Sequence, residues 1–432
     1  METTLFAGSA SSAAANKILP LRQQAEVRNR WLMRRLESIL PEIMQRESID
    51  MWCVISREYN EDPVIMSLLP EPMMHARRRT ILLFFRRDDG SVERLVLSRY
   101  GLGEFYEAAW NPEEEDQWEC LGRLARERQP KSIGVNSSAT FAFGDGLTHT
   151  EHELLHQALG ADLAENTKSA ERLCVGWLER RLPEEIDAYA GIAEITHAIV
   201  KDAFSSMLIH PGVTTCDDVV WWMRERMKQL GLRPWFQPSV SIQAPGQMAV
   251  GPASSAKEAR KLILPGDLLH CDVGMMYLGL ATDVQQHAYV LRLGEDSVPE
   301  GLVSALADAN RFQDICCEEF ITGRTGNEIL KAALSRAQQE SIRASLYTHP
   351  LGYHGHAAGP TIGLWDNQQA VHGPGDYELF EDTCYALELN ITKAVPEWGG
   401  QDVRIALEQD VLFRQGKVHF LAGRQQQFHL VR

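Results

Sequence analysis

Two apolar runs around a Tyr-Leu-Gly turn, residues 268–276 and 280–284, constrain the fold more than any other part of the sequence. Each run contains one aspartate, Asp272 in the first and Asp283 in the second. Apolar runs that flank a short glycine turn predict a β-hairpin. We place the centre of this hairpin between Tyr277 and Leu278, so that Asp272 and Asp283 face each other across the two strands.

Opposed carboxylates on a buried sheet face repel each other and lose their hydration. A bound cation removes both penalties, so the two aspartates are predicted to be metal ligands. The alternative is a pair of aspartates on an exposed face, which the surrounding Leu, Val and Met residues disfavour.

Three histidines, His349, His354 and His356, lie within eight residues and are separated by proline and glycine. This spacing indicates a loop or an irregular strand and not a helix. A lone histidine is more often a structural residue than a ligand. Three so close together, in a chain with 14 histidines, are candidates for metal or substrate binding.

Two glutamates interrupt apolar segments near the C-terminus, Glu388 within residues 384–391 and Glu408 within residues 403–412. An acid in a buried strand needs a partner. Arg404 would serve either one in an ordinary ion pair. Together with the two aspartates and a histidine, however, the glutamates make a ligand set that suits two divalent ions such as Mn²⁺, Co²⁺ or Zn²⁺.

In type and order these residues resemble the pita-bread metallohydrolases, a family that includes methionine aminopeptidase, aminopeptidase P, prolidase and creatinase. Residues 272–274 (Asp-Val-Gly) and 282–283 (Thr-Asp) are similar to the two aspartate motifs of the family, eleven residues apart. His349 and His356 keep the seven-residue spacing between a metal-binding and a substrate-facing histidine. The resemblance extends from about Leu182 to the C-terminus, and the upstream half resembles the creatinase and prolidase N-terminal domain.

The sequence departs from the family pattern in three places. Glu388 is followed by Leu-Asn where the family has Pro-Gly, and a long insert, residues 357–382, precedes it. The closing motif reads Arg-Ile-Ala-Leu-Glu, so Glu408 is assigned from the alternation of strand faces. The family also has a catalytic histidine upstream of the first aspartate, whereas residues 240–252 contain none. The metal site is therefore expected to be intact and the substrate pocket altered.

The resemblance implies an α/β (α+β) chain with a C-terminal pita-bread catalytic domain, residues 176–432, and a smaller creatinase-like α/β domain, residues 19–175. Two domains also agree with the length of 432 residues. Residues 1–18 are small and polar and predict a disordered tail. In the first domain, residues 80–85 and 92–97 predict a hairpin. The sequence has no internal repeat of fixed period.

The function that the resemblance implies is that of a Xaa-Pro peptidase, of aminopeptidase P or prolidase type, that uses a hydroxide activated by two metal ions. Glu388 would be both a ligand and a proton acceptor, and His356 would be catalytic. His354 and Arg404 would contact the substrate. The implied ligands of the two ions (Mn, Co or Zn) are Asp272, Asp283, His349, Glu388 and Glu408.

Two alternatives remain open. One is a pita-bread enzyme that acts on a small non-peptide substrate, as creatinase and the sulfoniopropionate lyases do, and the missing upstream histidine favours it. The other is a protein that has lost its metals and serves as a binding module, which the retention of all five ligands disfavours.

Composition limits the partners and the location. The formal net charge of −16 would repel polyanions, so neither nucleic acid nor an anionic membrane is expected as a partner. No stretch approaches the roughly 20 apolar residues of a membrane span. The eight cysteines form no CxxC pair, and residues 1–24 show no secretory signal, which together predict a cytoplasmic protein with reduced thiols. The two-domain relatives predict a homodimer that acts on a small peptide.

Overall fold

The computed structural model describes residues 9–247 and 261–432 and divides the chain into two compact units. The N-terminal unit is Pro20–Leu182, and the C-terminal unit is Pro183–Arg432 together with residues 9–19. The boundary lies after Leu182 and not after residue 175. The reason is that helix α7 (Glu171–Glu179) belongs to the N-terminal unit. Trp177 Nε1 of this helix donates a hydrogen bond to Ser67 Oγ of the same unit at 2.7 Å.

Residues 9–18 are not the disordered tail that their composition predicts. They contain helix α1 (Ala10–Ala14), which is docked on helix α8 (Pro183–Ala203). The backbone N–H groups of Ala10 and Ser11 donate to the Asp202 carboxylate at 3.0 and 2.8 Å. A carboxylate that accepts the unpaired N–H groups at a helix start stabilises that helix. Residues 1–8, the rest of the predicted tail, lie outside the described residues.

The N-terminal unit is built on a mixed six-stranded sheet with the order β4-β3-β2-β1-β5-β6. The predicted hairpin is confirmed, because β2 and β3 pair antiparallel around a turn at residues 88–90. Strand β1 joins β2 antiparallel and β5 parallel. The strands are β1 (Met51–Arg57), β2 (Arg79–Arg86), β3 (Val92–Leu97), β4 (Glu107–Ala108), β5 (Ile133–Val135) and β6 (Thr167–Ser169). Besides α7, the helices are α2 (Leu21–Glu37), α3 (Ile39–Arg46), α4 (Pro63–Leu68), α5 (Gln117–Arg128) and α6 (His149–Ala164).

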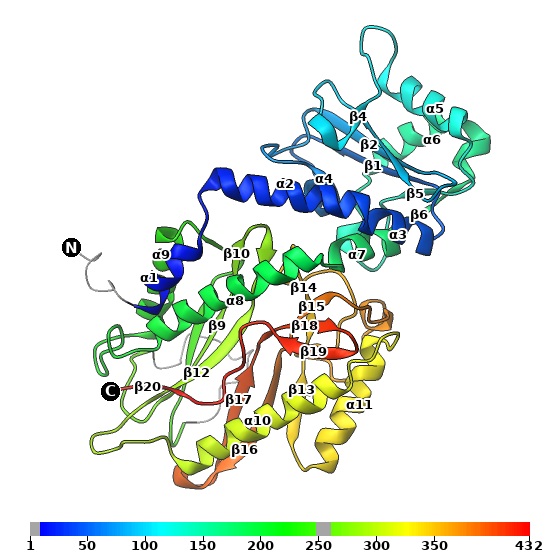
Figure 1. Ribbon diagram of the computed structural model, residues 1–432. Coiled ribbons are helices and arrows are strands. Elements are labelled where there is room, and N and C mark those ends of the chain that lie inside the picture. Colours follow the sequence, from blue (N-terminus) through cyan, green and yellow to red (C-terminus); the bar gives the residue numbers. More distant parts are fainter. Residues whose placement is uncertain (1–8, 248–260) are drawn as a thin grey trace. The chain divides into compact units, whose positions relative to one another are not determined.

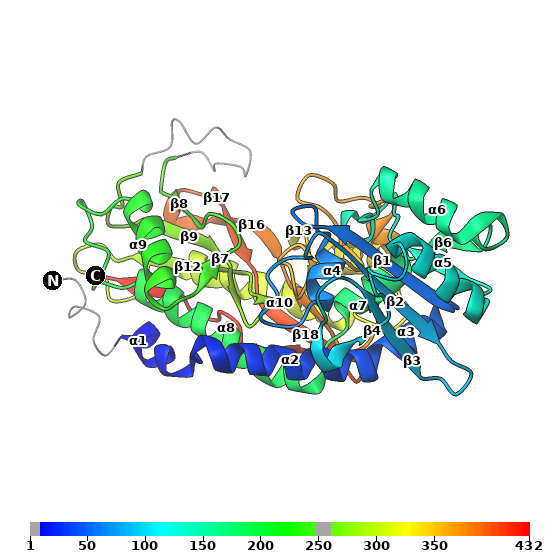
Figure 2. The ribbon, with the colours of Figure 1, turned by 90° about the horizontal axis from the view of Figure 1, so that it is seen from above.

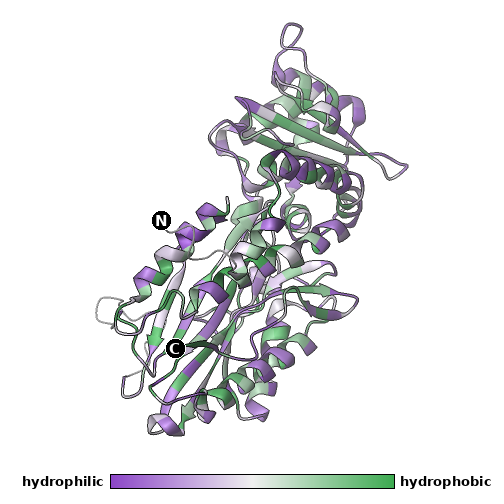
Figure 3. Ribbon diagram, turned by 60° about the vertical axis from the view of Figure 1, so that its left-hand side comes forward, coloured by the Kyte–Doolittle hydropathy of each residue, from purple (hydrophilic) through white to green (hydrophobic). Residues whose placement is uncertain are grey.

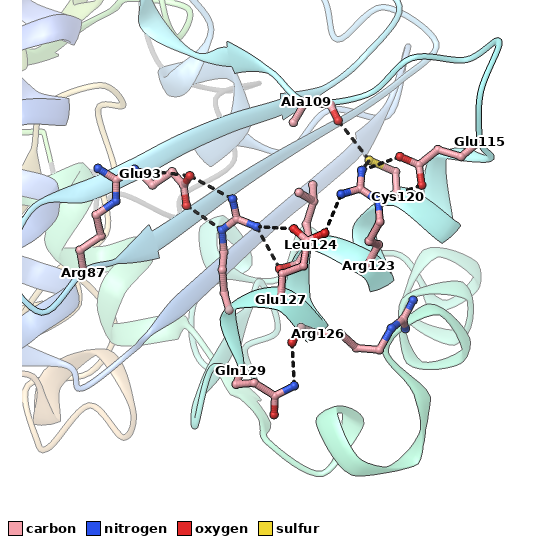
Figure 4. Close-up of polar contacts among 11 residues, drawn as sticks. Arg87, Glu93, Ala109, Glu115, Cys120, Arg123, Leu124, Arg126, Glu127 and Gln129 are labelled. Carbon is pink, nitrogen blue, oxygen red and sulfur yellow. Dashed lines mark hydrogen bonds and ion pairs between the residues drawn. The ribbon is translucent and has the colours of Figure 1, made fainter.

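Helix α5 is fixed to this sheet and to its own N-terminal loop by two arginines (Figure 4). Arg128 donates through Nε and Nη2 to the two carboxylate oxygens of Glu93 on β3, at 2.7 and 3.0 Å. Arg123 makes the same two-point contact with Glu115, at 3.2 and 2.6 Å. Asp116 caps the helix start in a capping box. Two-point contacts fix orientation as well as distance, so the Arg128–Glu93 contact restrains how α5 lies against the sheet.

The described residues of the C-terminal unit form four small sheets. Their orders are β20-β12-β9-β8, β11-β10-β7, β13-β16-β17 and β14-β15-β18-β19. The strands up to the middle of the unit are β7 (Arg233–Pro234), β8 (Ser239–Gln243), β9 (Leu268–Val273), β10 (Met275–Tyr277), β11 (Leu280–Ala281) and β12 (Val284–Val290). The later strands are β13 (Arg343–Leu346), β14 (His349–Leu351), β15 (Thr383–Ala386), β16 (Leu389–Val395), β17 (Gln401–Leu407), β18 (Asp410–Arg414), β19 (Lys417–Phe420) and β20 (His429–Val431).

An arrangement of two helices followed by strands occurs twice among the described residues of this unit. Figure 1 shows both helix pairs, and Figure 2 shows the first pair from above. Helix α8 and helix α9 (Cys216–Gln229) form the first pair, and α9 packs against β8. Helix α10 (Glu300–Glu318) and helix α11 (Gly326–Gln339) form the second pair and pack against β16 and β13. Thr215 and Thr325 cap the second helix of each pair in the same capping box. The repeat has no fixed period because the segments after the two helix pairs differ in length.

Each unit has its own hydrophobic core. In the C-terminal unit, Phe320, which follows α10, packs onto Tyr385 of β15 and Phe413 of β18, and Phe312 belongs to the same core. Figure 3 shows hydrophobic and hydrophilic residues alternating along the helices, as expected for helices that cover a sheet with one face. Among the described residues, no helix combines the length and apolar character needed to span a bilayer.

The hairpin around the Tyr-Leu-Gly turn exists, but its centre lies one residue later than predicted. Leu278 and Gly279 have φ angles of 53° and 81°, and a two-residue hairpin loop of the common type I′ needs positive φ at both positions. Asp272 on β9 is therefore paired with Gln285 on β12. The predicted direct pairing of Asp272 with Asp283 is wrong, because a shift of the centre by one residue moves every partner by two.

Replacing Gly279 with alanine is expected to lower the free energy of unfolding by about 1 kcal/mol, because a Cβ atom is unfavourable at positive φ. The measurement is urea denaturation at equilibrium. Asparagine tolerates this conformation better, so Gly279→Asn is the matched variant and should lose less. Identical midpoints for wild type and Gly279→Ala would contradict the turn assignment.

Candidate metal centre

The five residues predicted as ligands come together in the C-terminal unit. They lie on or next to strand ends: Asp272 in β9, Asp283 just before β12, His349 at the start of β14, Glu388 between β15 and β16, and Glu408 between β17 and β18. Three overlapping groups each have one potential ligand atom per residue within 4.8 Å of one another. These groups are Asp272, Asp283 and Glu408; His349, Glu388 and Glu408; and Asp283, His349 and His356.

The two glutamates face each other because two strands change sheet at the same level. Pairing of β16 with β17 ends at Leu389 and Leu407, and pairing of β15 with β18 starts at Ala386 and Asp410. Both registers place Glu388 opposite Glu408, in the gap between the two sheets. Regular pairing is interrupted there, so the side chains of both residues can turn toward the hairpin from β9 and β12. Glu408 also forms a β-bridge with Gln285 of that hairpin.

Four buried atoms in this cluster have no hydrogen-bond partner among the described residues: Asp272 Oδ1, Asp283 Oδ1, His349 Nε2 and Glu408 Oε1. His349 Nε2 lies 3.4 Å from Glu408 Oε1 and 3.7 Å from Asp283 Oδ2. The other ring nitrogen, Nδ1, lies 3.2 Å from the Pro350 carbonyl and donates to it, which leaves a lone pair on Nε2. Acceptor atoms that gather in one place with no hydrogen-bond donor among the described residues fit a shared cation.

Burial and mutual repulsion shift the acids of this cluster in one direction. Burial raises the pKa of Asp272, Asp283 and Glu388 above the usual range, and the charge of Glu408 adds to each shift. Burial raises the pKa of Glu408 itself to about 8. For His349, burial lowers the pKa, which favours the neutral, metal-binding form of the ring. Without a cation, the cluster therefore holds protons that free carboxyl groups would release at neutral pH.

Arg404 lies on β17, next to the acids. Its pKa is lowered by burial, while Glu388 and Asp272 act in the opposite direction through their charges. Its backbone is held by the side chain of Gln243 on β8, which accepts from Arg404 N at 2.9 Å and donates to Arg404 O at 2.7 Å. The structure thus places this arginine beside the cluster, as either predicted role requires.

His356 borders the cluster, is exposed on one side, and contacts three other rings. Its ring centroid lies 4.6 Å from that of His349, 5.2 Å from that of Trp235 and 5.9 Å from that of Tyr347. Trp235 is fixed by a 2.9 Å hydrogen bond from Nε1 to the carbonyl of Thr282, next to Asp283. His354 lies two residues before His356 but belongs to none of the three ligand groups.

Sequence reasoning missed two residues of the centre, Trp235 and Gln285. Gln285 Nε2 lies 2.9 Å from Glu388 Oε1 and 2.8 Å from Glu408 Oε2. The available signal was the polar run Gln285-Gln286-His287 inside an otherwise apolar strand. Trp235 had no such signal, since it is distant in sequence from the other site residues. The structure describes only part of residues 240–252, the upstream region that lacks a histidine. Strand β8 is described, and residues 248–252 lie outside the described residues.

Comparison with known proteins places this geometry in context. No family model matches the chain. A curated relative, a putative Xaa-Pro aminopeptidase from Mycoplasma pneumoniae, is 26% identical over 247 residues, or 57% of this chain. The match covers 63% of that relative, which is less than two thirds of its length.

Solved structures resemble the chain over almost its whole length. The X-Pro aminopeptidase from Thermotoga maritima MSB8 has a TM-score of 0.61 and 16% identity, covering 90% of this chain and 100% of its own. The Xaa-Pro dipeptidase from Bacillus anthracis has a TM-score of 0.61 and 17% identity, covering 92% and 99%. The N-terminal domain of the FACT complex subunit SPT16 from Cicer arietinum has a TM-score of 0.54 and 12% identity, covering 93% and 99%. The two-domain α/β fold expected from the sequence is thereby confirmed.

Proposed function

We propose that this chain, which has the two-domain pita-bread fold of Xaa-Pro aminopeptidases and prolidases, is a metal-dependent hydrolase that cleaves Xaa-Pro peptide bonds. One observation carries the proposal: buried acceptor atoms of Asp272, Asp283, His349 and Glu408 converge without partners among the described residues. Buried polar groups are normally hydrogen-bonded. Exceptions that gather in one place and are all acceptors, most of them carboxylate oxygens, support a cation site.

The donor set fits divalent ions of intermediate hardness. Four carboxylates and one imidazole suit Mn²⁺, Co²⁺ or Zn²⁺, and we propose that two such ions bind. Bound there, they would polarise an amide carbonyl and lower the pKa of a water molecule. The residues that would hold them are Asp272, Asp283, His349, Glu388 and Glu408.

Two residues are proposed to act on protons and on developing charge. Burial raises the pKa of Glu388, which makes its carboxylate a better proton acceptor than a solvated one. Burial lowers the pKa of His356 to about 4, so its ring is neutral at neutral pH and carries one N–H. A neutral N–H donor next to the centre would stabilise the carbonyl oxygen or the leaving nitrogen as charge develops there.

The surroundings of His356 support a substrate with a proline ring. Trp235 and Tyr347 both lie beside His356 and supply aromatic surface close to the acids. A pyrrolidine ring is compact and apolar, so it would bury surface against such faces. His354 and Arg404 are proposed substrate contacts, and a guanidinium beside the centre would suit the carboxylate of a short peptide.

A non-peptide substrate is the second candidate. The observation that favours it is the absence of histidine from residues 240–252, where the resemblance leads one to expect a catalytic histidine. A metal-free binding role is the third candidate, because fold alone does not decide activity and the fold also occurs in a FACT complex subunit. The four partnerless atoms weigh against this third role.

The deciding experiment measures metal content and hydrolysis in the purified full-length chain. After loading with Mn²⁺, Co²⁺ or Zn²⁺, we expect release of the residue before proline from Xaa-Pro dipeptides or Xaa-Pro-Yaa tripeptides, and none from matched Xaa-Ala peptides. Metal uptake without turnover of any Xaa-Pro peptide would support the non-peptide alternative. A chain that takes up no divalent ion would support the binding module.

Replacing His356 with alanine is expected to lower kcat for Xaa-Pro hydrolysis by about 100-fold, the usual contribution of one transition-state donor. Metal content should not change, because His349 and the four acids remain. The assay combines steady-state kinetics with metal analysis of the same sample. Unchanged kcat in a fully loaded variant would contradict the proposed role of His356.

The location and assembly are also proposals. The structure describes all eight cysteines as thiols, which supports a reducing compartment such as the cytoplasm. A homodimer is proposed from the resemblance alone, and light scattering of the purified chain would test it.

A further inference from the structure

Gln285 occupies the middle of a row of side chains that crosses the centre. Strand pairing places Gln285 between Asp272 on β9 and Glu408, and Glu408 in turn faces Glu388. Gln285 is only 4% exposed. Its position on β12 follows from the hairpin register, which moved it into the place that Asp283 was predicted to take.

Both ends of the Gln285 amide are engaged. Nε2 donates to Glu388 Oε1 at 2.9 Å and to Glu408 Oε2 at 2.8 Å. Oε1 lies 2.8 Å from His270 Nε2, which donates to it. The opposite orientation of the amide would bring its carbonyl oxygen against two carboxylates, so the network itself selects the orientation.

These hydrogen bonds decide which oxygens remain available in the centre. Glu408 Oε2 is held by Gln285, while Glu408 Oε1 has no partner and lies 3.4 Å from His349 Nε2. Glu388 is likewise held through Oε1, which leaves its other oxygen for a further ligand. Residues that hydrogen-bond to metal ligands commonly orient those ligands in this way.

We propose that Gln285 is a positioning residue of the metal centre: by donating one N–H to each of Glu388 and Glu408, it turns their remaining oxygens toward the cations. This inference rests on the proposed metal site. Gln285 itself is not a ligand, because its N–H groups face the acids and its oxygen faces His270.

The chain contains a matched control in the next residue. Gln286 is also 4% exposed, and its Oε1 lies 2.7 Å from a ring nitrogen, His429 Nε2. Successive residues of a strand point to opposite faces, so Gln286 faces away from the centre. Gln285→Leu and Gln286→Leu thus remove the same amide, equally buried, from the same strand.

The experiment titrates Mn²⁺ into the metal-free, full-length protein and follows binding by electron paramagnetic resonance, with thermal unfolding of each metal-free sample. We expect Gln285→Leu to weaken Mn²⁺ binding by about 10–100-fold and to alter the spectrum of the bound ion. Gln286→Leu should lower the unfolding temperature but keep wild-type affinity and spectrum. His270→Phe, which leaves Gln285 in place without its donor, should shift affinity in the same direction by a smaller factor.

The outcomes separate this inference from the function on which it rests. If wild type binds no Mn²⁺, the metal site and the inference both fail. If wild type binds Mn²⁺ and Gln285→Leu binds it with equal affinity and spectrum, only the inference fails. Equal losses in Gln285→Leu and Gln286→Leu would also overturn it, because they would indicate general damage to β12. If Gln285→Leu does not fold, His270→Phe decides in the same way.

Discussion

Replacing Asp283 with asparagine is expected to abolish both divalent-ion binding and peptide hydrolysis while making the metal-free protein more stable. Asp283 belongs to two of the three ligand groups and is 3% exposed. Asparagine keeps the shape but removes one charge from a set of acids that repel one another. Ion affinity should fall by more than about 10–100-fold, which is the loss expected when a residue that only hydrogen-bonds to the ligands is replaced. The free energy of unfolding without metal should rise by about 1 kcal/mol or more.

The two effects need separate measurements on the same preparations. Metal affinity is measured by titration calorimetry, and stability is measured by thermal unfolding in the presence of a chelator. Asp296→Asn, an exposed acid in the turn before α10, is the control for a charge change without a role in the centre. Wild-type ion affinity in Asp283→Asn would show that the five residues do not form the site.

The second large effect concerns the free energy of unfolding. Without metal it should fall as pH rises, and bound divalent ions should reverse this fall. Burial raises the folded-state pKa of Glu408 to about 8 and shifts Asp272, Asp283 and Glu388 in the same direction. A group whose folded pKa is raised binds more protons when folded than when unfolded. It therefore stabilises the fold fully below its unfolded pKa of about 4, and this contribution is lost as pH rises through the folded pKa. Metal-free protein should lose stability between about pH 5 and pH 8 and above.

Divalent ions should reverse this trend, since they replace the protons that the acids hold. At a free concentration of about 100 times Kd, a bound ion adds about 2.7 kcal/mol. For a unit of this size, that raises the unfolding temperature by roughly 5–10 °C. Thermal unfolding at pH 5.5, 7.0 and 8.5, with Mn²⁺ or with chelator, should show the largest gain at the highest pH. A metal-free stability that increases with pH would contradict the raised pKa values.

Much of the centre is visible in the sequence, because it depends on residue type within local runs. Asp272, Glu388 and Glu408 are acids in apolar segments, and such acids need a partner whatever the fold. His349 and His356 stand in a run rich in proline and glycine that does not form a helix; His349 begins the short strand β14, and His356 lies in the loop after it. These features, in this order, carry the family resemblance from which the two-domain fold and the proposed ligand set are predicted.

The features that were predicted wrongly, or not at all, depend on how strands meet. The hairpin centre depended on whether Tyr277 or Gly279 joins Leu278 at positive φ, and a shift by one residue replaced Asp283 with Gln285 as the partner of Asp272. The order of residues 9–18 depended on Asp202, which lies nearly two hundred residues away in the sequence.

The sequence by itself determined which side chains carry charge within apolar surroundings and where many of the helices and strands lie, helix α1 excepted, because these follow from neighbours a few residues apart. Only the tertiary structure decided that Glu388 faces Glu408, that Trp235 packs beside His356, and that the amide of Gln285 lies between two acids. Those contacts arise where separate sheets end at the same level. The physical reason is that register across distant strands is set by turn geometry and packing, which no local pattern encodes.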